Sequence, residues 1–473
     1  MPRRLRRVAK QAARLEAGAD CARANRFVIE LLPLWMVASL MLLLFSGYPV
    51  AFVLIAVAMV FAAIAIVVGE MPVAMLQMIQ MRVYSLVADN LIFPAVPPLV
   101  LMGVALSRSG AIRELLAVVV DRFRAVPGGM AITVLLVGIL LAPTAGLLGA
   151  AVGTLALATL PSLLESGYRP SLAAASVAAA GTLGVGLPPA VMLFFLADLV
   201  GAPIVGMFGA VLGPAALLVV LYIAYFAWQG RHSLAGRATG SPAVGGWSAV
   251  SAVLGPVAVV ASVLIPIATG WATPSQSGTF GALGALVLLI RSTGFDRTVI
   301  RETLLETAYV TAMVFMVIIA ANVFSFVFRV LEGDQMVARF IEHIGAGPWG
   351  TLALILGLIF VLGFFIDWLE IVLITLPIFM PVIAGLDFGS HVGSPLMVKL
   401  WVGAAIAMVL QTSFLTPPFG FALFFLRGAA PDQLPIGQIY RGVAPLVAFQ
   451  LLALMLLLAV PSLGTYLPGK LID

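Results

Sequence analysis

Long apolar runs separated by short polar gaps make up most of the chain. Runs of helix-spanning length occur near residues 31–69, 91–107, 128–163, 172–195, 203–228, 248–270, 277–291, 306–331, 350–384, 397–426 and 441–462. A helix needs about 20 apolar residues to cross a bilayer, and several of these runs are long enough for two passes. The pattern therefore predicts an all-α polytopic membrane protein with roughly 11 to 14 membrane-embedded helices.

The composition agrees with this class. Of the 473 residues, 62% are hydrophobic and 10% are charged, and the mean hydropathy is +1.16. A water-soluble domain of this size could not cover its surface with so few charges. The single cysteine, Cys21, excludes an internal disulfide and a thiolate metal cluster built by this chain alone. No zinc-ligand spacing or nucleophile motif is present, so we expect neither an enzyme nor a nucleic-acid-binding protein.

Two hydrophilic segments divide the chain. Residues 1–26 hold eight Lys and Arg residues. They form either a cytoplasmic arm that contacts membrane lipids or sequence upstream of the true start. Residues 229–247 are predicted to be a linker, cytoplasmic because of Arg231 and Arg237. This linker would separate a first transmembrane half, residues 27–228, from a second, residues 248–473.

Each half contains a double proline within a long apolar stretch. The shared order is Thr-Leu-Pro, then Pro-Pro, then Phe-Phe, at 159–161, 188–189 and 194–195 and again at 375–377, 417–418 and 424–425. A proline lacks an amide donor and frees backbone carbonyls that lipid cannot satisfy. Paired interruptions of this kind are the best sequence indication of the ion and substrate site of a secondary transporter. The repeat therefore predicts one broken helix in each half.

Two further features precede each double proline. Charged stretches near residues 108–124 and 329–342 have helical spacing, and they fit either interfacial helices or ordinary polar loops. Each is followed by an apolar segment that is interrupted, at 143–149 in the first half and at 363–370 in the second. Such a segment is either a kinked span or a re-entrant hairpin whose tip lies at the protein centre.

Three acidic residues are candidates for function. Asp367 and Glu370 lie three residues apart, on one helical face of the second interruption. A carboxylate at membrane depth is costly unless it is paired or hydrated, so such acids are functional candidates. The alternative for Asp367 is a helix N-cap that faces water. Asp198, just after Phe194-Phe195, could instead lie at a membrane boundary.

These motifs resemble the large membrane subunit of tripartite ATP-independent periplasmic (TRAP) transporters, the DctM-like family, in particular its mannitol/chloroaromatic compound branch. The resemblance runs from about Leu31 onward and rests on the stretch Gln411 to Gly428, on Asp367-Trp368-Leu369-Glu370 and on Gly181-Thr182-Leu183-Gly184. It implies an elevator-type secondary transporter of the bacterial inner (cytoplasmic) membrane, with a re-entrant hairpin and a broken helix in each half.

The resemblance also implies sodium as the coupling ion and no other cofactor. It implies two protein partners, one in the periplasm and one in the membrane. A periplasmic substrate-binding protein (DctP-like) would deliver an organic acid, and a small four-helix membrane subunit (DctQ-like) would complete the complex. An autonomous sodium/carboxylate symporter without a binding protein is the main alternative. An antiporter-like proton relay is not expected, because the only lysines are Lys10, Lys399 and Lys470.

The same resemblance implies two sodium sites, one in each half. The first would combine Thr144 to Gly149 with Thr182 to Pro188, and the second would combine Gly363 to Asp367 with Gln411 to Pro417. The candidate ion- and substrate-binding residues are Thr144, Gly146, Gly149, Thr182, Gly184, Pro188, Gly363, Asp367, Glu370, Gln411, Thr412, Ser413, Thr416 and Pro417. Sodium would be ligated through Thr144, Gly149, Thr182, Asp367, Thr412 and Thr416.

The chemistry of these residues suits a hard cation. Helix breaks present carbonyls at half-helix C-terminal ends, and neighbouring hydroxyls add further oxygens. The alternative is that each hydroxyl bonds back to a preceding carbonyl and only softens its helix.

The first hairpin departs from the family pattern. Many relatives with sugar-acid substrates carry a Gly-Ser-Ser-like tip and often have Ser after the first double proline. This chain has Gly146-Leu147-Leu148-Gly149 and Ala190 at these places. We therefore expect a less polar pocket, for a hydrophobic or aromatic carboxylate or a small 2-oxo or hydroxy acid rather than a sugar acid.

Overall fold

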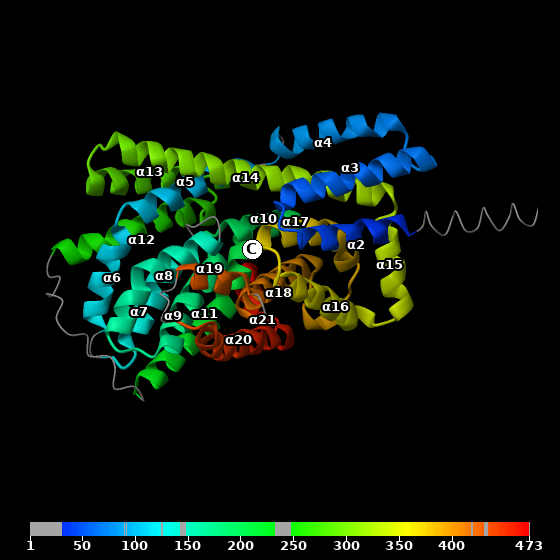
Figure 1. The fold of residues 1–473 in the computed structure, drawn as a ribbon. Coiled ribbons are helices and arrows are strands. Elements are labelled where there is room, and N and C mark those ends of the chain that lie inside the picture. The colour runs from blue at the N-terminus through cyan, green and yellow to red at the C-terminus, as the bar shows by residue number, and fades with distance from the viewer. Residues whose placement is uncertain are drawn as a thin grey trace, which may run out of the picture. The chain divides into compact units, whose positions relative to one another are not determined.

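A computed structural model describes residues 31–88, 90, 92–123, 126–141, 148–231, 247–417, 420–429 and 434–472. Throughout these residues the secondary structure is helical, with turns and short connections and no strand (Figure 1). The prediction of an all-α protein is confirmed. The basic segment 1–26 and most of the linker 229–247 lie outside the described residues.

The described chain forms two compact units, each built from separate stretches of sequence. Unit 1 comprises residues 31–84 and 316–345. Its elements are α2 (Leu32–Leu44), α3 (Val50–Val68), η1 (Val73–Met75), most of α4 (Leu76–Ala88), the second part of α14 (Arg297–Val330) and α15 (Gly333–Ile344). Within this unit α2 packs against α3 and α15.

Unit 2 comprises residues 85–315 and 346–472. Its first elements are η2 (Phe93–Ala95), α5 (Val96–Arg108), α6 (Ala111–Arg122), α7 (Gly129–Leu141), α8 (Leu148–Glu165), α9 (Pro170–Val185), α10 (Val191–Val200), α11 (Ile204–Arg231), α12 (Trp247–Ala268), α13 (Pro274–Thr293) and the first part of α14. The later ones are α16 (Gly347–Leu362), α17 (Trp368–Ala384), η4 (Gly389–His391), α18 (Pro395–Leu415), α19 (Phe421–Ala429), α20 (Ile436–Ala459) and α21 (Ser462–Ile472).

Among the described residues, six helices are long and apolar enough to cross a membrane, and a seventh span is obtained if the bent pair α5 and α6 is counted. The six are α3, α11, α12, α14, α18 and α20. Seven shorter apolar helices accompany them, namely α2, α7, α8, α9, α10, α16 and α17. These shorter helices have 10 to 17 residues, at or below the lower limit of about 17 residues for crossing a bilayer, as expected of hairpin arms and of the parts of broken helices.

The same order of elements occurs twice along the chain. An amphipathic helix (α6 or α15) precedes a pair of apolar helices (α7 and α8, or α16 and α17), then an interrupted helix (α9 and α10, or α18 and α19), then a long helix (α11 or α20). The charged stretches that could have been loops are therefore helices. Repeats and compact units divide the chain differently, because unit 1 takes residues from both predicted halves. The division into halves stays a prediction.

Two almost completely buried helices place both interruptions inside unit 2. All residues of α9 from Leu172 to Val185 are buried, and its many alanines allow α7, α8 and α20 to pack closely around it. In α18, the residues from Leu400 to Leu415 are buried as well, and its neighbours include α9, α10, α16, α17, α20 and α21 (Figure 1). A helix that is apolar on all sides belongs in the interior, so each interruption lies at the end of a core helix.

Candidate functional site

The first interruption lies between α9 and α10, as the double proline predicts. Helix α9 ends at Val185 and α10 begins at Val191. The intervening turn is held by the amide of Leu187, which donates to the carbonyl of Gly184 at 3.2 Å, and by the amide of Ala190, which donates to the carbonyl of Leu187 at 2.8 Å. Pro188 lies in this turn and has no amide hydrogen, so the regular helical ladder cannot continue through it.

The second interruption lies between α18 and α19. Helix α18 ends at Leu415, and the amide of Thr416 donates to the carbonyl of Ser413 at 3.2 Å. Pro417 follows as an exposed residue, and the chain enters α19 after Gly420, which has a φ of 47°. Both predicted broken helices are thus present in the structure.

Gly186 and Gln411 bring the two interruptions together. A Cβ atom built on Gly186 would lie only 1.4 Å from Nε2 of Gln411, so the amide group of Gln411 rests directly on the backbone of the first interruption. The Gln411 side chain is buried, and its Oε1 has no hydrogen-bond partner among the described residues. A buried amide oxygen without a partner is costly, which is the state expected of a group that binds something else.

The turn between α16 and α17 also contacts α18. A Cβ on Gly363 would lie 1.9 Å from Oγ of Ser413, so only glycine permits this approach. Asp367 is the N-cap of α17, because its Oδ1 accepts a hydrogen bond from the amide of Trp368 at 2.8 Å. The capping alternative for Asp367 is therefore realised, although its side chain is half-buried in protein. The cap holds the carboxylate at the start of α17, close to the helix N-terminus that favours negative charge.

Two further polar atoms near this turn lack partners within the described part of the chain. Oε2 of Glu370 and Nε1 of Trp368 are both fully enclosed and make no hydrogen bond. Leaving such an atom buried and unpaired costs about 1–3 kcal/mol, and more for a charged group. With Oε1 of Gln411, these are two acceptors and one donor on α17 and α18 that have no hydrogen-bond partner within the described residues.

The four predicted hydroxyl ligands that lie within the described residues donate to carbonyls three or four residues earlier in the chain. Thr182 donates to Ala178, Thr412 to Met408, Thr416 to Thr412 and Ser413 to Leu410, each at 2.8 Å. This is the back-bonded arrangement that the sequence left open. It leaves the hydroxyl lone pairs available, because a hydroxyl that donates its hydrogen can still accept twice. Back-bonding and cation ligation are therefore compatible at these four residues.

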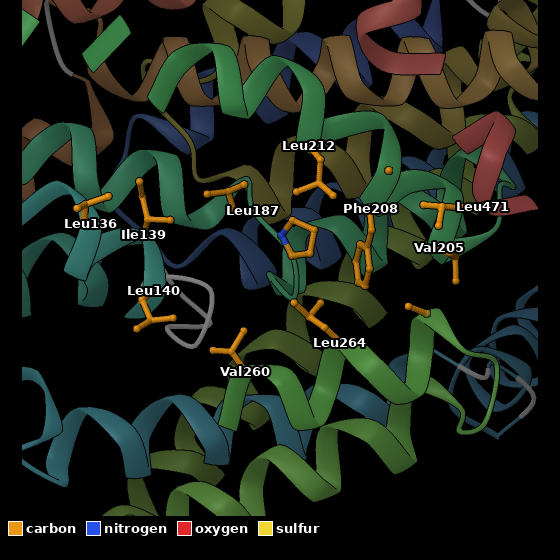
Figure 2. A pocket seen from close by; sticks show the side chains of 13 residues that line it. Leu136, Ile139, Leu140, Leu187, Val205, Phe208, Leu212, Val260, Leu264 and Leu471 are labelled. Carbon is orange, nitrogen blue, oxygen red and sulfur yellow. The ribbon is translucent and has the colours of Figure 1, made fainter. Parts of the chain in front are cut away.

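An apolar groove of about 590 Å³ adjoins the first interruption. Leu187 and Pro188 form part of its wall, and the rest comes from aliphatic side chains of α7 and α12, from α11, which includes Phe208, and from Leu471 of α21. Figure 2 shows Leu187 among the labelled side chains of this wall, with Phe208 and Leu264 beside it. The lining is almost entirely apolar, and the expectation of a less polar substrate pocket stays a prediction.

Some of the remaining predicted site residues lie within the described residues and others do not. Thr144 and Gly146 lie outside the described residues, and Gly149 lies in the first turn of α8. Gly184 is buried in the last turn of α9. The structure thus brings together the second-half residues Gly363 and Ser413 and joins Gln411 to the first-half interruption.

The sequence did not indicate the contact between Asn90 and Asp198. Nδ2 of Asn90 donates to both carboxylate oxygens of Asp198, at 3.3 and 3.1 Å, while Oδ1 of Asn90 accepts from the amides of Ile92 and Phe93. Beside this contact, the rings of Phe93 and Phe195 lie 5.4 Å apart. An Asn that bonds to the backbone two residues later is a common turn signal, but no local pattern could connect it to Asp198.

The ring of Phe195 lies 5.8 Å from that of Trp368. A continuous line of contacts therefore runs from the turn before α5, through α10, to the start of α17. Asp198 is located near the end of α10, where a carboxylate is disfavoured by the helix dipole. The hydrogen bonds from Asn90 compensate for that position.

Comparison with known proteins gives one family. The family described as "Tripartite ATP-independent periplasmic transporter, DctM component" matches residues 37–463. The isethionate TRAP transporter permease protein DctMQ of Oleidesulfovibrio alaskensis is 27% identical over 443 residues, which cover 90% of this chain. The chain spans 65% of that protein's length.

Two further relatives are covered over most of their length. The C4-dicarboxylate TRAP transporter large permease protein DctM of Pseudomonas aeruginosa is 26% identical, with 80% of this chain and 86% of the relative covered. The sialic acid TRAP transporter large permease protein SiaM of Vibrio cholerae is 26% identical, with 90% and 96% covered. The crystal structure of the Alcanivorax borkumensis YdaH transporter matches 93% of this chain and 99% of its own, with a TM-score of 0.53 and 15% identity, and so shares the fold.

Proposed function

Because this chain belongs to the DctM family of TRAP transporters and is a large permease subunit, we propose that it couples the uptake of an organic acid to sodium entry. It is a multi-pass protein of the bacterial inner membrane. The observation that carries the proposal is the contact of Gln411 with Gly186, which joins the interrupted helices of both halves. Secondary transporters place ion and substrate sites at such junctions of discontinuous helices.

Sodium occupies two positions in this proposal. In the second half, the carboxylate of Asp367, the hydroxyls of Thr412 and Thr416 and carbonyls of the turn after Gly363 provide the oxygen ligands. In the first half, Thr182 and carbonyls of the turn before Pro188 do so, together with the first hairpin. Support comes from the buried and unpaired oxygens of Glu370 and Gln411, because acidic and polar groups without partners at membrane depth mark ion and substrate paths.

Partners follow from the family. A TRAP large permease works with a small permease subunit and a periplasmic binding protein. In our proposal these are a four-helix DctQ-like subunit and a DctP-like protein that captures the substrate. An autonomous symporter is the less favoured alternative.

The proposed substrate is a hydrophobic or aromatic carboxylate, or a small 2-oxo or hydroxy acid. The apolar groove beside Pro188 supports a weakly polar surrounding for the first interruption. The names of the relatives cover isethionate, C4-dicarboxylates and sialic acid, so the family's carboxylate and sulfonate substrates differ widely in the group attached to the anion. The identity of the binding protein would decide which acid reaches this chain.

Uptake in proteoliposomes tests the proposal. The large and small subunits are reconstituted together, and labelled organic acids are added with and without the binding protein under an inward sodium or potassium gradient. We expect uptake that requires both sodium and the binding protein. Equal uptake in the potassium gradient would contradict sodium coupling, and sodium-driven uptake indifferent to the binding protein would favour the autonomous symporter.

A further inference from the structure

A second cavity lies between α6, α12 and α13, away from both helix interruptions. It has a volume of about 450 Å³, and its wall includes Glu114 of α6, Ser251 and Pro256 of α12, and Leu288 and Arg291 of α13. Helix α12 packs against both α6 and α13, and the three labels lie together at one end of Figure 1. We refer to this cavity as the α6 groove.

Polarity changes along the α6 groove. Arg291 lies in the last turn of α13, and Ser251 lies near the start of α12. These two helices are joined by the short turn 269–273 at their other ends, so Arg291 and Ser251 lie at the same membrane surface. Leu288 and Pro256 lie about one turn further along each helix, toward the hydrocarbon region. The groove is therefore polar at the surface and apolar below, as an amphiphilic ligand requires.

One acidic and one basic side chain line the groove without forming an ion pair with each other. Glu114 and Arg291 both line it, yet neither forms an ion pair within the described part of the chain. Two opposite charges that border one cavity without forming an ion pair leave space for a ligand that carries both signs. Arg binds phosphate well because its planar guanidinium presents several donors, and a carboxylate is the usual partner of an ammonium group.

The charge distribution indicates which side of the membrane the groove faces. Arg108, Arg113 and Arg122 belong to α5 and α6, and Arg297 and Arg301 begin α14, directly after α13. Arg108 also pairs with Glu302 and Glu306 of α14 at 2.7 Å, which brings these ends together. The opposite turn, 269–273, has no charged residue. An excess of Arg and Lys marks the cytoplasmic side, where basic pockets between helices bind phospholipid headgroups.

We propose that the α6 groove binds one phospholipid of the cytoplasmic leaflet, with a zwitterionic headgroup that ends in a primary ammonium, as in phosphatidylethanolamine. Its phosphate contacts Arg291 and its ammonium contacts Glu114, while the acyl chains follow Leu288 and Pro256 into the bilayer. The lipid then connects the amphipathic helix α6 to the α12–α13 pair. This site is independent of the sodium and substrate site.

Native mass spectrometry of the purified full chain with titrated lipids tests this site. For the wild type we expect one tightly retained phosphatidylethanolamine and weaker retention of phosphatidylglycerol, which has no ammonium. Arg291→Ala should weaken retention of either lipid about tenfold, the equivalent of one charged hydrogen bond. Glu114→Gln should leave retention of phosphatidylglycerol unchanged and remove the preference for phosphatidylethanolamine.

Arg301→Ala is the matched control, because it removes the same charge from the same membrane surface outside the groove. Leu288→Trp is a second test, since it fills the groove without changing charge and should also abolish retention. Equal losses in Arg291→Ala and Arg301→Ala would show that general surface charge holds the lipid and would overturn the site. Unchanged retention in Arg291→Ala, or a wild-type preference for phosphatidylglycerol, would also overturn it.

Discussion

Replacing Gly186 by alanine places a methyl group on the buried amide of Gln411. The new Cβ would lie 1.4 Å from Nε2 and 2.7 Å from Cδ of Gln411, well inside the usual contact distance of about 3.5 Å. Gly186 has a φ of −93° and a ψ of 3°, which alanine adopts, so the backbone itself is not strained. The conflict must be relieved by the Gln411 side chain, which has to move by about 2 Å.

We expect the variant to fold and to show its effect in the sodium dependence of uptake. Overpacking a core with one methyl group costs about 1–3 kcal/mol, which a membrane protein of this size tolerates. In our proposal the unpaired Oε1 of Gln411 adds a further ligand to the second sodium position, so displacing Gln411 from the junction removes one polar contact to the ion. Such a contact is worth about 1.5–3 kcal/mol, and 1.4 kcal/mol corresponds to a factor of ten. We therefore expect the sodium concentration for half-maximal uptake to rise roughly tenfold to a hundredfold.

The assay is uptake in proteoliposomes as a function of sodium concentration. Gly357→Ala is the control, because no atom lies within 4 Å of the Cβ it would add on α16. Gly186→Ala combined with Gln411→Ala should recover thermal stability, since the clash is removed, but not sodium affinity. Wild-type sodium dependence in folded Gly186→Ala protein would refute the reasoning, as would an equal effect of Gly357→Ala.

Two further predictions concern the same site, and a third concerns the contact between Asn90 and Asp198. Thr182→Val should raise the sodium concentration for half-maximal uptake severalfold. Thr159→Val removes an equally buried and back-bonded hydroxyl from α8 and should not change it. Equal effects of the two substitutions would mean that Thr182 contributes only to helix packing. Asp367→Asn should preserve the cap of α17 and its thermal stability, because Asn caps as well as Asp, yet weaken sodium dependence; unchanged uptake curves would remove Asp367 from the ion site. Asn90→Ala should lower the free energy of unfolding by about 1–3 kcal/mol, because it leaves the Asp198 carboxylate without its hydrogen-bond donor. The measurement is thermal unfolding. An unchanged unfolding midpoint would show that water replaces the amide.

Local chemistry made the interruptions predictable from the sequence. A proline pair within an apolar run stops a helix wherever it occurs, so the ends of α9 and α18 follow directly from Pro188 and Pro417. The cap at Asp367 was also readable, as an acidic residue at the start of an apolar helix. The sequence did not decide whether the two charged stretches are helices or loops, because a short amphipathic segment is compatible with both.

Contacts between distant segments were not predictable. Nothing near Gly186 indicates that the Gln411 side chain fills the space where a Cβ would be, since that contact depends on how α9 and α18 pack in three dimensions. The same holds for Asn90 and Asp198, which belong to different elements. Periodicity describes which face of a helix is apolar but not which helix covers it, so these pairs required the structure.

The most direct test of the central claim is to measure radioactive sodium entry and organic acid uptake together in the same proteoliposomes, for the wild type and Gly186→Ala. The account predicts that sodium enters with the acid only when the binding protein and substrate are present, and that both fluxes fall together in the variant. Acid uptake without sodium entry, or sodium entry that Gly186→Ala leaves unchanged, would contradict it.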